Sequence, residues 1–306
     1  MSERQVVYMG NNFIEASYKC TPIEKKILNL AILKANRREF PAKPNPLLTY
    51  IVKINRNDLL DIAGLDARRD FRHIKNACKS LNEKVLVFVD NEGKEFKTSS
   101  FITESELKNG ELKLGFYGRV IPFFNKLKKR FTSYDLLQTK QFTGKYTIRF
   151  YELIKQYEKI GKRKIAIETL RKMFQLEHKY LVYADFRRSV INSAQKELKE
   201  KSDLYFEYKQ NKEGRNIASI TLTIKLNSSS IDKKYYLQRV NDYLASQSVN
   251  DFYKDLIKYC RENDSNLSIS EKKSIHNLVY EKPDPKTLSE SLLYLFFQWL
   301  EPDLGL

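Results

Sequence analysis

The sequence predicts an α+β protein built from two tandem winged helices, each a helix-turn-helix with a β-hairpin, followed by a helical C-terminal region. Three observations lead to this prediction. The length of 306 residues suits two or three domains. The order helix, strand, helix, basic helix and hairpin occurs twice before residue 227, and the excess of basic over acidic residues is confined to the same part of the chain. We expect the first winged helix in residues 1–135, the second in 136–227, and a linker with a helical region of unknown role in 228–306.

The charge of the chain is strongly uneven. The net charge is +17 and the isoelectric point is near 9.5. Residues 228–306 contain 10 Lys/Arg and 12 Asp/Glu, which leaves 45 basic and 26 acidic residues in 1–227. A concentrated positive charge attracts polyanions, and nucleic acid is the commonest of them, so we expect a nucleic-acid partner. A generally basic soluble protein is the alternative.

The cysteines and the apolar runs indicate the compartment. Cys20, Cys78 and Cys260 are far apart and form no C-x-x-C, which favours a reducing cytosol over a disulfide framework or a zinc site. The first residues, MSERQVVYMGNN, lack the apolar core of a signal peptide. The longest apolar run, LLYLFFQWL, is far shorter than the roughly 20 residues that span a bilayer. We therefore expect a cytoplasmic protein.

The first unit opens with helix signals. A short helix is expected over residues 8–18. Thr21-Pro22-Ile23-Glu24 forms a capping box with proline at the first helical position, which predicts a second helix running to about Asn36. The proline-rich loop FPAKPNP then leads to a β-branched strand, TYIVKI, at residues 49–54.

The next stretch, NRNDLLDIAGLDARRDFRHIKNACKSLNEK, predicts helix, turn and helix. Asn55 is placed to cap the first helix, Gly64 to end it, and Asp66 to cap the second. The side of the second helix that we expect to be buried carries Phe71, Ile74, Cys78 and Leu81. Its other side carries Arg68, Arg69, Arg72, Lys75 and Lys79.

A hairpin completes the first unit. VLVFVD and KEFKTSSFITE are expected to be its strands, with a turn that contains Gly93. A further strand is expected over residues 111–117, and a basic helix from Pro122 to Arg130.

The second unit repeats this order. We expect a long helix over residues 145–159, a short strand over 164–167, and a short helix, ETLRKMFQL. A basic helix begins near Asp185. The hairpin that follows consists of DLYFEYK, the turn NKEG, and RNIASITLTIKL, whose alternating pattern predicts one buried face.

The basic helix of the second unit is the most informative segment. Its apolar side carries Phe186, Val190, Ile191, Ala194 and Leu198, at helical spacing. Its other side carries Arg187, Arg188, Asn192, Lys196 and Lys199. Arginines in a first helical turn oppose the helix dipole, so we expect an external anion to compensate them.

A recognition helix in the major groove places its N-terminal residues nearest the base edges, where Arg pairs with guanine and Asn with adenine. The residues that we expect to read bases are Arg187, Arg188, Asn192, Arg68, Arg69 and Arg72. The residues that we expect to contact phosphate, including those of the two wings, are Lys75, Lys79, Lys196, Lys199, Lys94, Lys97, Lys209, Lys212 and Arg215. A solvated basic face is the alternative for either helix, and its recurrence in two matching units argues against that alternative.

Several motifs resemble a known family. They are R-F-Y-E-L-I at 149–154, E-T-L-R at 168–171, D-F-R-R-S-V-I at 185–191, A-Q-K-E-L at 194–198 and G-R at 214–215. With NNFIEASYKCTPIEKKILNLAI at 11–32, they resemble the iteron-binding plasmid replication initiators, the Rep proteins, over about residues 6–227. Two positions differ from the family pattern: Gly144-Lys145 replaces a serine that usually caps the R-[LF]-Y-E-L helix, and Asn216 replaces a frequent basic residue.

The resemblance implies a specific function. Monomers would bind directly repeated iterons in double-stranded DNA at a bacterial plasmid origin, with both winged helices on one face of the duplex. Dimers joined through the first domain would bind an inverted repeat and repress the chain's own gene. Host replication proteins, such as a helicase or an initiator, would then be recruited.

Two other classes of function are alternatives. A nicking initiator enzyme needs closely spaced histidines for a metal, whereas His73, His178 and His276 form no H-x-H. Phosphate-loop and G-x-S-x-G motifs are also absent from the sequence, so we expect no catalysis, no metal and no cofactor. A winged-helix repressor without an initiator role is the closer rival, because fold does not settle function.

The apolar run near the C-terminus has two interpretations. Leu292, Leu293, Phe296, Phe297 and Leu300 lie near helical spacing in it. The stripe either packs inside a small helical bundle or docks to a partner protein.

Overall fold

The computed structural model describes most of the chain. The described residues are 5–37, 40–41, 43–89, 96–123, 131–227, 240–241, 243–245, 247–262, 284–288, 292–293 and 296, without the side chains of 86–89, 96–97 and 260. Residues 1–158 and 162–225 form one compact unit, which contains both predicted winged helices. Residues 159–161 and 226–306 form a second unit.

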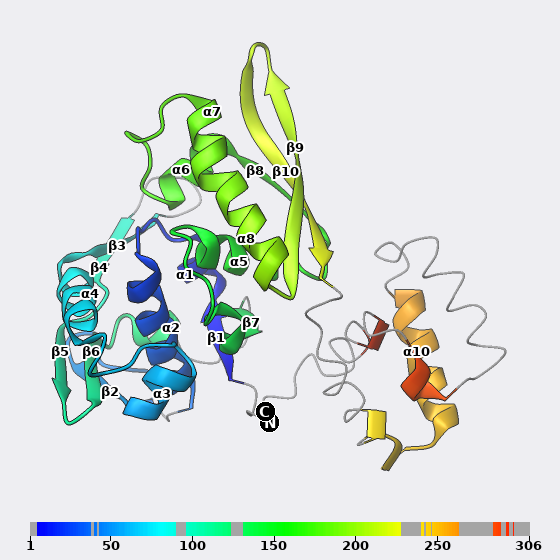
Figure 1. Cartoon of the computed structure of the whole chain (residues 1–306), viewed down its shortest axis with the longest axis horizontal. Helices are drawn as coiled ribbons and strands as arrows, with labels where there is room; N and C mark the ends of the chain where they lie inside the picture. The colour runs from blue at the N-terminus through cyan, green and yellow to red at the C-terminus, as the bar shows by residue number, and fades with distance from the viewer. Residues whose placement is uncertain are drawn as a thin grey trace. The chain divides into compact units, whose positions relative to one another are not determined.

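The first winged helix contains more strands than the second (Figure 1). Its elements are β1 (Val6–Gly10), α1 (Asn11–Glu15), α2 (Pro22–Asn36), β2 (Thr49–Ile54), α3 (Arg56–Asp61), α4 (Phe71–Glu83), β3 (Val85–Val89), β4 (Phe96–Ser100), β5 (Glu104–Lys108), β6 (Glu111–Tyr117), η1 (Ile121–Phe123), β7 (Phe131–Asp135) and η2 (Leu136–Thr139).

The predicted caps at Thr21 and Asn55 are confirmed, whereas Asp66 does not cap α4, whose N-cap is Asp70. The Thr21 hydroxyl accepts a hydrogen bond from the Glu24 amide at 3.3 Å, and the Glu24 carboxylate accepts one from the Thr21 amide at 2.8 Å. The helix opened by this box ends at Asn36, as predicted. The Asn55 side chain caps α3 by accepting from the Asp58 amide at 2.8 Å.

The sheets of the first winged helix differ from the prediction. Strand β2 pairs with β6, and β6 pairs with β5, which the sequence analysis did not predict. The predicted hairpin exists as β3 and β4 but forms a separate two-stranded ribbon. The expected helix at residues 8–18 is wrong in its first part, because Val6–Gly10 alternates partly buried and buried residues and pairs with β7 instead. Of the expected helix at 122–130, residues 124–130 lie outside the described residues.

The second winged helix follows the predicted order. Its elements are α5 (Thr147–Lys155), β8 (Lys162–Ala166), α6 (Ile167–Met173), α7 (Tyr183–Phe186), the π-helical turn η3 (Arg187–Asn192), α8 (Ser193–Lys201), β9 (Leu204–Glu213) and β10 (Asn216–Leu226). Strand β10 lies between β8 and β9 in the sheet. The β9–β10 hairpin is long and projects past α8 (Figure 1), and its turn is Gly214-Arg215, two residues instead of the expected four, with Gly214 at φ 61°.

Helix α5 lies at the centre of this compact unit. It packs against α8 and β9 of the second winged helix and against α1 and β7 of the first. All nine of its residues are buried, including the charged Arg149, Glu152 and Lys155. A helix buried on every side must pair its charges, and each of these three has a partner across the unit.

The second unit has its own apolar core around α10 (Val249–Glu262) and the short turn η6 (Pro285–Thr287). Leu292, Leu293 and Phe296 are buried in it beside Phe252 of α10, which supports the interpretation that the C-terminal stripe packs internally. Phe297 and residues 299–300 of that stripe lie outside the described residues. In the part of the chain that the structure describes, no helix has both the length and the apolar character needed to cross a membrane.

Candidate nucleic-acid interface

The basic helix of the second winged helix is one continuous segment, from α7 through η3 to α8. Its predicted apolar side is confirmed, since no residue of that side is more than 1% exposed: Phe186, Val190, Ile191, Ala194 and Leu198. Every residue of its predicted basic side is exposed: Arg187, Arg188, Asn192, Lys196 and Lys199.

The two arginines lie one turn later than predicted. The helix begins at Tyr183, so Arg187 and Arg188 follow its first turn, which contains Asp185. Arg188 forms an exposed ion pair with Asp185 at 2.8 Å. The conflict with the helix dipole is therefore smaller than the sequence suggested, because the dipole acts mainly on the first turn.

The arginines occupy a widened helical turn. Residues Arg187–Asn192 adopt π-helical geometry, which places Val190 and Ile191 together against the core while both arginines stay exposed. Such turns occur frequently at functional sites.

The wing is fixed to this helix by hydrogen bonds. The Tyr208 hydroxyl of β9 donates to the Asn192 side-chain oxygen at 2.7 Å, and the Gln195 amide donates to the Phe206 carbonyl at 2.9 Å. To read an adenine, the Asn192 oxygen must therefore accept a second hydrogen bond or give up the one from Tyr208. The exposed wing candidates Lys209, Lys212 and Arg215 lie at or near the tip of the β9–β10 hairpin.

Arg171, of the motif E-T-L-R, organises the loop before the helix, a role that the sequence analysis missed. Its guanidinium donates to the carbonyl oxygens of Lys179 at 2.9 Å and Tyr180 at 2.8 Å, and lies 4.4 Å from the centre of the Phe186 ring. These contacts hold the loop in one conformation where it joins the helix, with Tyr180 at φ 55°. The only signal in the sequence is an arginine within a family motif, which does not reveal its partners.

The basic helix of the first winged helix begins later than predicted. Asp66 accepts hydrogen bonds from the amides of Arg68 and Arg69, both at 2.9 Å, and so caps a turn that precedes α4. Arg69 then pairs with Asp70 at 2.9 Å. Both arginines are exposed, but they precede the helix on which the sequence analysis placed them.

On α4 itself, Arg72, Lys75 and Lys79 are exposed, as predicted. The expected burial of Phe71 is wrong, because Phe71 is the first residue of α4 and its side chain is 49% exposed. In the wing of this unit, Lys94 lies outside the described residues, and only the backbone of Lys97 is described, in β4.

Among the described residues, no side chain caps α5, and a distant helix instead holds the turn that leads into it. The Glu197 carboxylate of α8 accepts hydrogen bonds from the Thr143 and Gly144 amides, both at 2.8 Å, and from the Thr147 hydroxyl at 2.5 Å. A side chain at position 144 would collide with this carboxylate and with the Thr147 hydroxyl, which explains the glycine. Burial acts to raise the pKa of Glu197, but the Thr147 hydroxyl, the Thr143 amide and Lys201 outweigh it and lower the pKa to about 2.

Glu197→Gln should therefore reduce the free energy of unfolding by about 1–2 kcal/mol at pH 7, since it weakens the charge-assisted hydrogen bonds that hold the turn before α5. The folded-state pKa lies below the usual value of 4.5. The carboxylate thus stabilises the fold above about pH 4.5, and this contribution is lost as the pH falls towards 2. Urea unfolding at pH 7, 5 and 3 should show the difference between wild type and variant shrinking only below pH 4.5. Glu200→Gln, an exposed change on the same helix, is the control, and a difference that stays constant to pH 3 would contradict the assignment.

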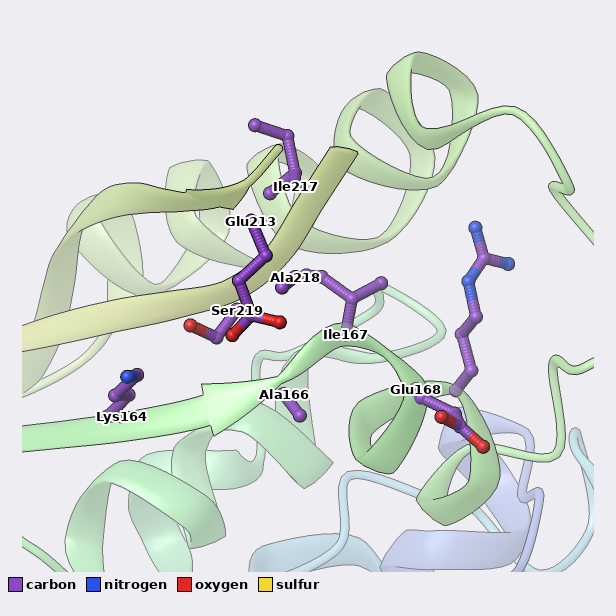
Figure 2. Close-up of a pocket in the computed structure, with 9 residues that line it drawn as sticks. Lys164, Ala166, Ile167, Glu168, Glu213, Ile217, Ala218 and Ser219 are labelled. Carbon is purple, nitrogen blue, oxygen red and sulfur yellow. The ribbon is translucent and has the colours of Figure 1, made fainter. Parts of the chain in front are cut away.

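A groove beside the second wing lacks the character of a phosphate site. It has a volume of about 730 Å³, and Figure 2 shows side chains of β8, α6 and the β9–β10 hairpin around it. Its lining carries no net positive charge, because the carboxylates of Glu168 and Glu213 balance the cationic groups of Lys164 and Arg171. We assign no DNA contact to this groove, because a phosphate backbone requires a positive surface.

Family profiles match nearly all of the first compact unit. The profile described as Initiator Replication protein, WH1, matches residues 6–155, and the profile described as Initiator Rep protein, WH2, matches residues 166–224. The chain belongs to the initiator Rep protein family. The family and the tandem winged-helix fold expected from the sequence are thereby confirmed. The first profile includes α5, which packs against both winged helices, and the predicted boundary at residue 135 stays a prediction.

Individual proteins agree with this membership. An uncharacterized 27.6 kDa protein of Escherichia coli is 23% identical over 228 residues, 72% of this chain and 95% of the relative. A replication initiation protein of Escherichia coli is 22% identical over 205 residues, which cover 65% of this chain and only 63% of the relative. The crystal structure of the Pi initiator protein in complex with iteron DNA has a TM-score of 0.56 and 18% identity, over 74% of this chain and 99% of that one. This likeness shows that the fold is shared.

Proposed function

We propose that this Rep family chain initiates plasmid replication by binding double-stranded iteron repeats at an origin. The observation that carries the proposal is a pair of exposed basic helices, α4 and η3–α8, held in one compact unit. Two recognition helices in one compact unit can enter two major grooves of the same duplex. The Pi initiator protein, which shares the fold, was solved with iteron DNA, and a relative is named for replication initiation.

A replication assay tests this proposal directly. A plasmid that carries the repeats but lacks this gene should replicate when the chain is supplied from a second replicon. The chain should also protect the direct repeats in a footprint. Protection without replication would favour the rival function, a repressor without an initiator role.

We also propose that the chain dimerises through its first winged helix and represses its own gene at an inverted repeat. A host helicase or initiator would be recruited at the origin, and the activity would be binding without catalysis. The acidic balance of residues 228–306 supports a role for that region other than DNA contact, because like charges repel the phosphate backbone.

The dimer proposal gives a testable difference between the two sites. If the dimer rearranges the first winged helix, α4 contributes less to binding of the inverted repeat than of a direct repeat. Arg72→Ala should then weaken binding to direct repeats by about 1–3 kcal/mol, and to the inverted repeat by less. Footprint titrations of wild type and variant on both DNAs measure this, and an equal loss on both would contradict the rearrangement.

A further inference from the structure

A second groove lies where the N-terminal part of α2, helix α4 and the loop before α5 meet. It has a volume of about 610 Å³, and its lining includes Asn76 and Ser80 of α4, Thr143 of the loop, and Glu24 and Lys26 of α2. Thr143 in turn donates its amide proton to Glu197 of α8. The groove is therefore bordered by the first basic helix and by a loop that is bonded to the second.

Lysines from four separate segments gather along this border: Lys19, Lys84, Lys145 and Lys179. Lys84 follows α4 one turn after Ser80, and Lys145 is two residues from Thr143, so both adjoin groove-lining residues. Lys145 is exposed and Lys84 is half-buried.

The other two lysines are brought to the same place by contacts between the winged helices. The Tyr18 amide donates to the Met173 carbonyl at 3.2 Å, which sets Lys19 of the first winged helix beside the second. Arg171 holds the carbonyl of Lys179, whose amine is exposed in the loop before the recognition helix.

The positive charges of this lysine cluster are little compensated by carboxylates. Burial lowers the pKa of Lys145, and the positive charges of Lys19, Lys179 and Lys84 lower it further, so these three lysines lie close enough to act on the Lys145 amine. Lys84 pairs with Glu24. Within the described residues, Lys19, Lys145 and Lys179 form no ion pair with a carboxylate. Gathered cations repel one another, and a bound anion would relieve the repulsion.

The expected geometry of the DNA supplies such an anion. Two helices that enter successive major grooves on one face of a duplex leave a minor groove, edged by two phosphate strands, facing the protein between them. We propose that the groove beside α4, with Lys19, Lys84, Lys145 and Lys179 on its border, holds the phosphate backbone between the two half-sites of one repeat. This inference rests on the proposed function and adds a third contact region, which fixes register without reading sequence.

Lys145→Gln and Lys179→Gln test the inference, because both amines are exposed and their loss should leave the fold intact. Each variant should bind a single repeat about threefold to tenfold more weakly, with a salt slope shallower by about 0.9. Methylphosphonates at the central phosphates should weaken wild-type binding, and should have little further effect on the double variant. Lys254→Gln makes the same charge change at a 75% exposed lysine of α10 and should leave affinity and slope unchanged.

If wild type prefers the repeat to random duplex, two results would still overturn the inference. One is an unchanged affinity and salt slope in both lysine variants. The other is an equal effect of the methylphosphonates on wild type and double variant. If wild type binds the repeat no better than random duplex, the proposed function fails, and this inference fails with it.

Discussion

Replacing Glu152 by alanine should lower the free energy of unfolding by about 3–5 kcal/mol, because it leaves the ammonium of Lys25 buried without its partner. Lys25 of α2 and Glu152 of α5 are 2% and 0% exposed, and their charged atoms lie 2.9 Å apart. Asn29 and Tyr134 donate to the same carboxylate oxygen at 3.1 Å and 2.7 Å. Burial acts to lower the pKa of Lys25, but Glu152 raises it, so the lysine is charged in the folded protein.

Urea unfolding of Glu152→Ala beside Glu168→Ala measures this effect. Glu168 pairs with Lys172 but is 77% exposed, so its loss should cost less than about 1 kcal/mol. The double change Lys25→Met with Glu152→Leu should recover much of the lost stability, since it removes both buried charges together. A loss of less than about 1 kcal/mol in Glu152→Ala would show that the pair does not hold α2 against α5.

Local signals predicted a large part of this fold. The capping box at Thr21, the Asn55 cap and the apolar side of the second basic helix all depend on residues close in sequence, and each is found as expected. The pairing of β1 with β7 joins residues more than a hundred positions apart, and no local pattern shows it. Sequence periodicity specifies which face of an element is buried, and it does not specify the partner.

The same limit applies to the candidate interface. The exposed residues of α4 and η3–α8 were predicted, because a basic side opposite an apolar side is a local pattern. Three features depend on tertiary contacts: the bonds of Glu197 to the turn before α5, the Tyr208 bond to Asn192, and the lysine cluster. One signal was available and not used: α5 carries apolar residues on all sides, which implies that its charges are buried and paired.

Arg187→Ala should weaken binding to the cognate repeat by about 1–3 kcal/mol and change binding to random duplex little, because an arginine that reads guanine discriminates by that amount. Arg187 is exposed on the widened turn and, among the described residues, forms no ion pair. Arg188 must share its guanidinium with Asp185, at 2.8 Å. Titration of both DNAs at fixed salt should therefore show a larger loss for Arg187→Ala than for Arg188→Ala.

Lys199→Ala is the matched control on the same helix. Its exposed amine lies 5.6 Å from the centre of the Tyr205 ring, and we expect it to contact phosphate, which carries no sequence information. Its loss should weaken binding to cognate and random duplex equally and make the salt slope shallower by about 0.9. If Arg187→Ala behaves like Lys199→Ala, with equal losses on both DNAs, then Arg187 contacts only the backbone. Base reading by this helix would then fall to Arg188 and Asn192, the two candidates that already have partners in the folded protein.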